Sequence, residues 1–170
     1  MSAVALAVAA FAAMEGVSYA AHRWVMHGRR GIAWHASHHR PAAARLERND
    51  LFPGLFSGVG VLLFLAAQTW PWLRPVAIGV TAYGVAYLVV HEVFIHRRLD
   101  VPLPRWRYLD WLRRSHALHH RYGGEPYGML LPVVPRSLRE RAAADGWSAD
   151  GAAVDRLVRR PSARATRSRL

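Results

Sequence analysis

The sequence predicts an all-α integral membrane protein, with three to four membrane-embedded helices and a histidine-rich cap on the cytoplasmic side. Three observations predict this class. Long apolar segments contain almost no charge, which is typical of helices that cross a bilayer. Arginines gather between and after these segments, and all ten histidines fall into four short motifs beside them.

Composition excludes several kinds of site. The chain has 170 residues and no cysteine, so it contains no disulfide, zinc–thiolate site or iron–sulfur cluster ligated by its own thiols. Its net charge is +12, and every basic residue is arginine. A GC-rich genome also produces an all-arginine set, so we do not interpret the basic charge as a sign of nucleic-acid binding.

The first apolar segment, residues 3–21, carries only Glu15 as a charge and is long enough to cross a hydrocarbon core of ~30 Å. A secretory signal peptide fits poorly, because no basic residue precedes the apolar run. We expect a retained transmembrane helix that continues to about His27 and ends at Gly28, where a C-cap glycine is favoured.

Two further spans are expected. Residues 51–69 contain no charge, and residues 76–90 form a third apolar helix that we expect to continue through His91 and His96. The turn between them, residues 69–75, holds Trp70 and Trp72, which suit an aromatic belt at the far interface. Before the second span, a short helix is expected over 35–39.

After residue 97 the chain becomes charged. A helix is predicted over 106–122, with an aromatic and aliphatic side suited to the membrane surface, and Gly123 and Gly124 end it. An apolar stretch over 127–134 is expected to be re-entrant or packed under a metal site. We divide the chain into a membrane domain, 1–135, and a basic tail, 136–170. The tail should have weak helices near 138–144 and 153–159 and then be disordered.

Topology connects these elements. The first span, and the hairpin of the second and third, would bring all four histidine motifs to one side of the membrane. The arginines gather on that side, whereas the far turn holds Arg74 alone. By the positive-inside rule, the histidine side should be cytoplasmic and the protein a multi-pass protein of the inner membrane.

The histidine motifs indicate a metal centre. In order along the chain they are the pair His22/His27, the triplet His35/His38/His39, the pair His91/His96 and the triplet His116/His119/His120. In a helix, positions i, i+3 and i+4 share a face, so each triplet should present three imidazoles toward one point and supply several ligands to a metal pair. Residues five apart diverge by ~140°, so the two pairs suit helix ends, or ligands for different metals.

Other metal chemistries fit less well. Carboxylate-bridged di-iron bundles use Glu-x-x-His pairs, and no glutamate here has a histidine three residues later. A membrane haem would need only two or four facing histidines. A zinc transporter would usually have polar groups in mid-span, where only Glu15 lies.

The order of the motifs resembles the membrane fatty-acid hydroxylase and sterol desaturase superfamily, and within it the bacterial β-carotene hydroxylases. The similarity covers about residues 10–135 and is carried by H-R-W-V-M-H-G, W-H-A-S-H-H-R-P, N-D-L, Y-G-V-A-Y-L-V-V-H-E-V-F-I-H-R-R and S-H-A-L-H-H. It implies a monooxygenase with two iron ions that uses O2 and electrons from a ferredoxin and its reductase. It also implies hydroxylation at the 3-position of a β-ionone ring, which gives zeaxanthin from β-carotene via cryptoxanthin.

Roles follow for individual residues. All ten histidines are expected as metal ligands, with no catalytic side chain beyond them. Five residues are candidates to support the ligands by hydrogen bonds: Glu15, Asn49, Asp50, Glu92 and Asp110. The alternative for each is a solvated or capping role. For Glu15 the alternative is a carboxylic acid that stays neutral inside the span. Tyr83 and Tyr87 should line a cleft for a carotenoid dissolved in the bilayer. The arginines would contact anionic membrane lipids or an acidic redox partner.

Two other functions stay open. The first is hydroxylation or desaturation of another membrane lipid, a fatty acid or a sterol. The second is a non-catalytic, histidine-rich metal-binding membrane protein, which would bind metal without consuming O2.

Overall fold

The computed structural model describes residues 1–40, 46–99, 101–102, 106–147 and 151–158. They form helices joined by turns and loops, and they contain no strand. The helices are α1 (Ala3–Ala20), η1 (Ala21–Met26), α2 (Ile32–His35), η2 (Arg48–Asp50), α3 (Leu51–Thr69), α4 (Leu73–Tyr87), η3 (Leu88–Ile95), α5 (Arg107–Tyr122), α6 (Arg136–Ala144) and α7 (Gly151–Val158). The elements η1 and η3 are π-helical continuations of α1 and α4, and η2 is a 3₁₀ turn.

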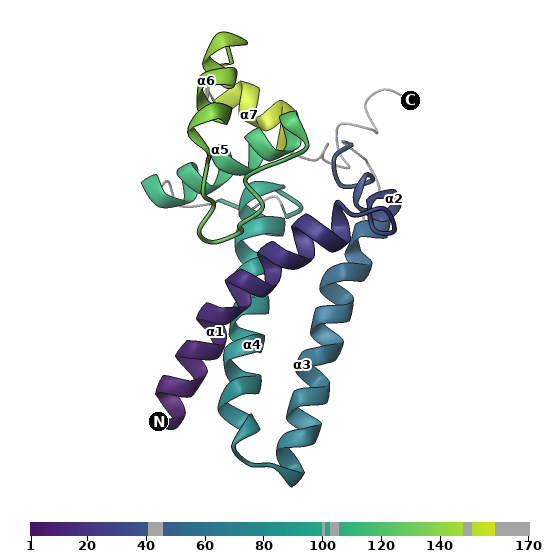
Figure 1. Ribbon diagram of the computed structural model, residues 1–170, viewed down its shortest axis with the longest axis vertical. Helices are drawn as coiled ribbons and strands as arrows, with labels where there is room; N and C mark the ends of the chain where they lie inside the picture. Colours follow the sequence, from purple (N-terminus) through teal and green to yellow (C-terminus); the bar gives the residue numbers. More distant parts are fainter. Residues whose placement is uncertain (41–45, 100, 103–105, 148–150, 159–170) are drawn as a thin grey trace.

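Three helices are long and apolar enough to cross a membrane: Ala3–Met26, Arg48–Thr69 and Leu73–Ile95. The predicted all-α membrane class is thereby confirmed. Helix α4 packs against both α1 and α3, and the turn between α3 and α4 lies at the end opposite the cap (Figure 1). The third span begins earlier than residue 76, because Arg74 and Pro75 fit the first helical turn, where proline is tolerated.

The contact between α1 and α4 is close. A Cβ atom added at Gly79 would lie 2.2 Å from the carbonyl oxygen of Ala7 and 2.8 Å from the Cβ of Ala10. Only glycine allows the two backbones to approach this far. By contrast, α1 has no buried residue, and large apolar side chains such as Leu62 of α3 are exposed, as expected for helices that face lipid.

A cap of α5, α6, α7 and the loop 123–135 lies over one end of the spans (Figure 1). Helix α5 ends at Gly123, whose φ of 70° is the left-handed conformation that favours glycine. Helix α7 packs against α5 through an apolar cluster that includes Phe94, Leu112 and Val154. Residues 151–158 therefore belong to the packed cap, while the predicted disorder of 159–170 lies outside the described residues.

Candidate metal centre

Each H-x4-H pair has its first histidine in a π-helical segment and its second at the C-cap of that segment. The backbone N–H of His27 donates to the carbonyl oxygen of His22 over 3.0 Å, and the N–H of His96 donates to that of His91 over 3.0 Å. These i→i+5 bonds add one residue to the turn, so residues five apart return to the same side. The imidazole centroids are 5.2 Å apart in the first pair and 4.6 Å apart in the second. Both pairs lie at helix ends, as the spacing predicted.

The first triplet starts at the end of α2. The helix expected over 35–39 is displaced, because α2 covers Ile32–His35 and tight turns follow it. Ser37 Oγ donates to the Trp34 carbonyl over 2.7 Å, and the N–H of His38 donates to the His35 carbonyl over 2.8 Å. Such i→i+3 bonds tighten the chain beyond an α-helical turn. The second triplet lies on the last turns of α5.

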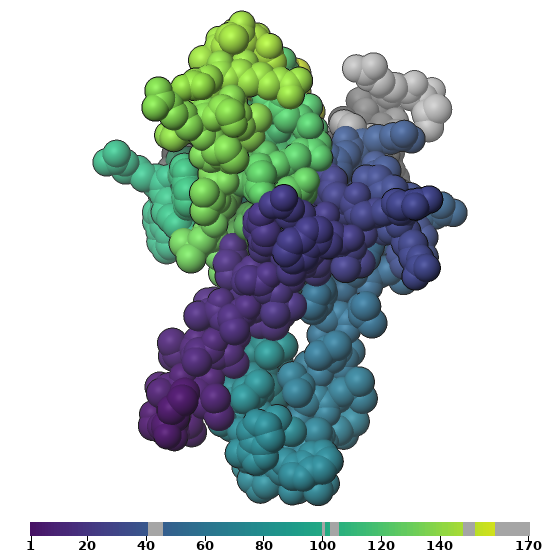
Figure 2. Space-filling view, in the orientation of Figure 1, coloured from purple at the N-terminus to yellow at the C-terminus, as the bar shows by residue number. Residues whose placement is uncertain are grey.

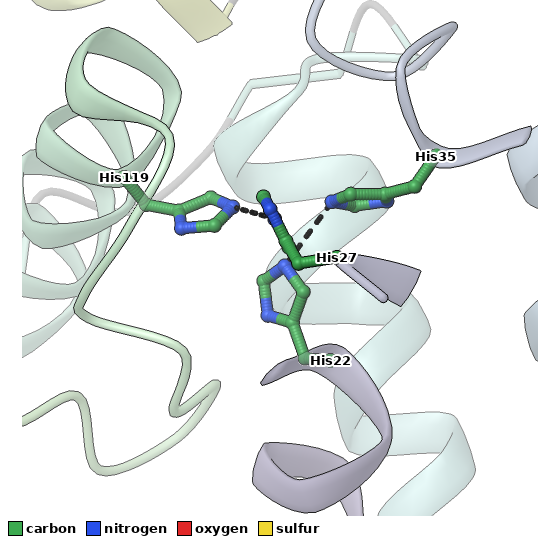
Figure 3. A group of neighbouring side chains, drawn as sticks. All are labelled: His22, His27, His35 and His119. Atoms are coloured by element: carbon green, nitrogen blue, oxygen red, sulfur yellow. Dashed lines mark hydrogen bonds between the residues drawn. The ribbon is translucent and has the colours of Figure 1, made fainter. Parts of the chain in front are cut away.

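The imidazoles gather into two groups. Within each group of four, the potential ligand atoms lie within 4.8 Å of one another. The first group is shown in Figure 3, where side chains from η1, α2 and α5 point toward one another. The first metal group is His22, His27, His35 and His119, and the second metal group is His38, His96, His116 and His120.

The remaining two histidines flank one group each. The Nε2 atom of His39 lies 3.1 Å from that of His35, beside the first metal group. The ring of His91 lies 4.6 Å from that of His96 and 4.8 Å from that of His116, beside the second. All ten predicted ligands are therefore brought together, five around each group.

The expectation that each triplet converges on one point is wrong. The first triplet directs His35 and His39 toward the first metal group and His38 toward the second. On α5 the division is reversed, since His119 joins the first group while the residues on either side of it in the motif, His116 and His120, join the second. Each triplet therefore contributes histidines to both metal groups.

Hydrogen bonds fix the tautomer of several rings. The Nδ1 atoms of His22, His96 and His119 bind the carbonyl oxygens of Tyr127, Val158 and Gly124. A carbonyl oxygen only accepts, so each Nδ1 carries the hydrogen and each Nε2 presents a lone pair. His35 Nδ1 donates in the same way to Asn49 Oδ1 over 2.8 Å.

The Nε2 atoms face one another at distances that fit a bound metal ion. They are 3.2 Å apart for His22 and His35, and 3.1 Å apart for His96 and His116. Metal–nitrogen bonds of ~2.0–2.1 Å place neighbouring ligand atoms about 3 Å apart. Two lone pairs at this distance repel unless a cation lies between them, and the Nδ1 bonds leave both His22 and His35 with Nε2 lone pairs. The donor set therefore fits metal ions that prefer imidazole, including iron.

Burial keeps these imidazoles neutral. Loss of hydration lowers the pKa of His35 to about 3 and that of His39 to about 4. The same cause holds the pKa of each of four others well below its ordinary range: His38, His116, His119 and His120. Neutral imidazole is the form that binds metal. In the described part of the chain, the buried Nε2 of His38 has no hydrogen-bond partner, which leaves it open to a cation.

The predicted supporting residues separate into two kinds. Asn49 is fully buried and binds His35, and Glu92 Oε1 accepts from His91 Nδ1 over 2.7 Å. Asp50 instead pairs with Arg98 and accepts the N–H of Glu47, so it holds the loop before α3. Asp110 lies in the first turn of α5, where the helix dipole favours an acidic side chain.

Glu15 holds a loop, and within the described ranges its hydrogen bonds go to that loop and to Tyr83 rather than to an imidazole. Its carboxylate accepts the backbone N–H groups of Met129, Leu130 and Leu131 over 2.8–3.0 Å and the hydroxyl of Tyr83 over 2.6 Å. The loop fixed in this way begins with Tyr127, whose carbonyl binds His22. Glu15 therefore acts on the metal group through the loop, whose Tyr127 ring lies 5.3 Å from that of His22, whereas Leu131 and Val133 are exposed.

Five partners were missed from the sequence: Glu47, Arg98 and the backbone carbonyls of Gly124, Tyr127 and Val158. Glu47 Oε2 lies 3.5 Å from His38 Nδ1, and Arg98 Nε lies 2.6 Å from Glu92 Oε2. The backbone carbonyl of Tyr127 has no signal in a side-chain pattern. Glu47 and Arg98 are charged residues near motifs, but only the fold shows that they face each other.

An apolar cavity of about 330 Å³ lies between α1, α3 and α4. Tyr83 and Tyr87 line it, as predicted, together with Met14, Met26 and Phe56 among others. Met26 precedes His27, and the ring of Tyr87 stacks on that of His91 with centroids 4.8 Å apart. The surface is hollowed between α1 and α3 (Figure 2), and two of the lining residues, Met26 and Tyr87, lie next to histidines.

Comparisons with known proteins agree with this geometry. The family model described as fatty acid hydroxylase matches residues 7–138. The chain is 38% identical over 124 residues to a beta-carotene hydroxylase of Paracoccus sp. (strain PC1), covering 72% of this chain and 76% of the relative. It is 39% identical over 134 residues to a beta-carotene hydroxylase of Pseudescherichia vulneris, covering 75% of each. A chloroplastic beta-carotene 3-hydroxylase 1 of Arabidopsis thaliana is 34% identical over 146 residues, covering 80% of this chain and 46% of the relative. No solved structure matches the chain.

Proposed function

This chain belongs to the fatty acid hydroxylase family, and from that premise we propose that it hydroxylates the β-ionone ring of a carotenoid at a histidine-bound metal centre. The proposed substrate is β-carotene and the final product zeaxanthin, with cryptoxanthin between them. One observation carries the proposal: two groups of neutral, buried imidazoles lie beside an apolar cavity between the membrane spans. The similarity to beta-carotene hydroxylases selects the substrate class.

The ten histidines would hold two iron ions, one in each metal group. When bound, the iron would supply the reductive activation of O2 that hydroxylation of an unactivated C–H bond requires. Other residues of the chain would hold the histidine rings in position. The carbonyl oxygens at Tyr127, Gly124 and Val158 fix the orientation of three rings, and burial under the cap keeps water from the donor atoms.

The cavity suits one end of a carotenoid. At the ~30 Å³ that one water molecule occupies in the liquid, a cavity of about 330 Å³ has room for a methylated ring and not for a whole carotenoid. The polyene chain would then extend into the bilayer through the hollow between α1 and α3. Phe52, Phe56 and Phe64 of α3 line the cavity and would contact the ring, while Tyr87 would lie between the ring and His91.

We further propose that the protein is a multi-pass protein of the inner membrane with the metal centre on the cytoplasmic side. The arginines on the histidine side support this orientation through the positive-inside rule. They would contact anionic lipid headgroups, and they would also attract an acidic ferredoxin, which is the expected electron donor together with its reductase.

Expression in cells that accumulate β-carotene, followed by pigment chromatography, tests the function. We expect mono- and dihydroxylated products that appear only with O2 and that take up label from ¹⁸O2. His119→Ala should abolish them, because this residue faces the first metal group. Unchanged pigment, with full-length protein in the membrane and iron bound, would contradict the carotenoid assignment.

The same experiment separates two other functions. The matching family model is described as fatty acid hydroxylase, so hydroxylated or desaturated acyl chains or sterols in the lipid extract would redirect the assignment to another membrane lipid. Bound metal without any O2-dependent product would instead indicate a non-catalytic metal-binding protein.

A further inference from the structure

We infer that the two metal groups are inequivalent, and that the second metal group binds a divalent cation first and more tightly than the first metal group. The inference rests on the proposed metal centre, but not on the substrate. It follows from what lies behind the imidazoles: amide oxygens bind rings of the first metal group, whereas carboxylates lie behind His38 of the second group and behind the flanking His91.

The first metal group is supported by neutral oxygens. His22 Nδ1 lies 3.0 Å from the carbonyl oxygen of Tyr127, His35 Nδ1 lies 2.8 Å from Asn49 Oδ1, and His119 Nδ1 binds the carbonyl oxygen of Gly124. Within the described ranges, each Nδ1 hydrogen bond of this group thus ends on an amide oxygen. These partners orient the rings and add no formal charge.

One ring of the second metal group, His38, has a carboxylate behind it, and so does His91, which flanks the group. Glu92 Oε1 binds Nδ1 of His91 over 2.7 Å, and Glu47 Oε2 lies 3.5 Å from Nδ1 of His38. The two carboxylate side chains are only 6% and 3% exposed. His38 and His91 also stack on each other, with centroids 4.8 Å apart. His96 differs, since it binds the carbonyl oxygen of Val158.

Arg98 holds these carboxylates in place. Its Nε lies 2.6 Å from Glu92 Oε2, its NH2 nitrogen pairs with Asp50 Oδ1, and the same nitrogen lies 4.0 Å from Glu47 Oε2. The N–H of Glu47 in turn donates to Asp50 Oδ2 over 2.9 Å. The guanidinium is a positioning group on the outer side of the carboxylates, so each carboxylate lies between the cation and its histidine.

A carboxylate behind an imidazole strengthens metal binding. It makes the ring a more basic ligand and offsets the positive charge of the ion, and removal of such a partner typically costs 10–100-fold in metal affinity. Amide oxygens orient a ring without the charge. We therefore expect the second metal group to exceed the first in affinity by about 10-fold or more, so the groups fill in order.

Zinc provides the test, because imidazole binds Zn²⁺ and the ion has no redox chemistry. The metal-free full-length protein, in detergent micelles, is titrated with Zn²⁺ against a competing chelator of known affinity. We expect two steps separated by about 10-fold or more. His96→Ala should remove the tight step and His22→Ala the weak step, which assigns each step to its group.

Two matched variants then test the cause. Glu92→Gln keeps the shape and removes the charge, and should weaken the tight step by about 10–100-fold while leaving the weak step unchanged. Asn49→Asp places a carboxylate behind His35 and should tighten the weak step. A gain in affinity cannot come from misfolding, so this variant stays informative if Glu92→Gln unfolds.

The outcomes are distinct. A single step with two ions bound, or a tight step lost in His22→Ala, would overturn the inequivalence and leave the metal centre intact. Absence of Zn²⁺ binding would overturn the metal centre itself. Two assigned steps in a protein that leaves β-carotene unchanged would support the inference and contradict the proposed function.

Discussion

The backbone N–H of His27 donates to the carbonyl oxygen of His22 across 3.0 Å, and this i→i+5 bond brings the two imidazoles to the same metal group. In an α-helix, side chains five residues apart diverge by ~140°. The π turn removes that divergence at the end of the first span. The same turn occurs at His91 and His96, at the end of the third span.

Double substitutions should therefore differ in how many metal ions they remove, depending on whether the two histidines belong to one metal group or to both. His22 and His27 serve one metal group, so the double substitution to alanine should lose about one metal ion per chain, as each single substitution does. His35 and His38 serve different groups although three residues apart, so their double substitution should lose about both ions. Metal analysis after dialysis measures this. Equal losses in the two double variants would contradict the division of the triplet.

Glu15 should matter for stability and for the first metal group. Glu15→Gln places an amide N–H₂ against backbone donors of residues 129–131, which leaves half-buried N–H groups without an acceptor and costs on the order of 1 kcal/mol. Tyr83→Phe removes a single hydrogen bond and should cost about 0.5–1.5 kcal/mol. Thermal unfolding in micelles compares them. Unfolding of Glu15→Gln at the wild-type temperature would show that the loop is held by other contacts.

Filling the cavity should reduce turnover without loss of metal. Gly84 lines the cavity, and a Cβ added there meets nothing within 4 Å, so Gly84→Leu would project into the space proposed for the ring. Gly58 also has open space but does not line the cavity, which makes Gly58→Leu the control. We expect at least a 10-fold lower rate of β-carotene hydroxylation for the first variant alone. Equal rates would place the substrate elsewhere.

Acid should destabilise the metal-free protein. Burial lowers the pKa of His35 to about 3 and of His39 to about 4, whereas the unfolded chain binds these protons near pH 6.5. The unfolded state therefore holds more protons between about pH 6.5 and 4, and stability falls on acidification by up to ~1.4 kcal/mol per pH unit for each such histidine.

Unfolding temperatures measured from pH 8 to pH 4.5 should be flat above about pH 6.5 and decrease below it. Replacing both histidines by glutamine should make the decrease shallower. If the unfolding temperature instead rose on acidification, these imidazoles would not be buried in the neutral form.

The exposed aromatic end of α5 predicts contact with the membrane surface. Trp106 and Trp111 are 64% and 41% exposed, and amphipathic aromatic rings favour the headgroup region. Because the chain lacks cysteine, Trp111→Cys gives a unique site for a spin label. In vesicles, a spin label at position 111 should collide more often with O2, and less often with a water-soluble nickel chelate, than a label attached to Arg139→Cys on α6. Equal accessibility would place this end of α5 in water.

The sequence predicted the elements well because their signals are local. The uncharged run of residues 51–69 became α3 with the same limits, and α5 ends at Gly123, where the helix was expected to end. The spacing of the histidines also identified a candidate metal centre, although each triplet is divided between two groups and the first triplet continues from α2 into turns.

The tertiary structure alone decided which histidine belongs to which metal group. His35 and His38 share a motif but face different metal groups, because a group is formed by whichever helices approach it. Glu15, expected near the histidines, binds residues 129–131, and Arg98 faces three carboxylates from two separate segments. Such contacts join residues far apart in the chain, so the sequence determined the helices and ligands, and the packing of the helices determined which ligand serves which metal group.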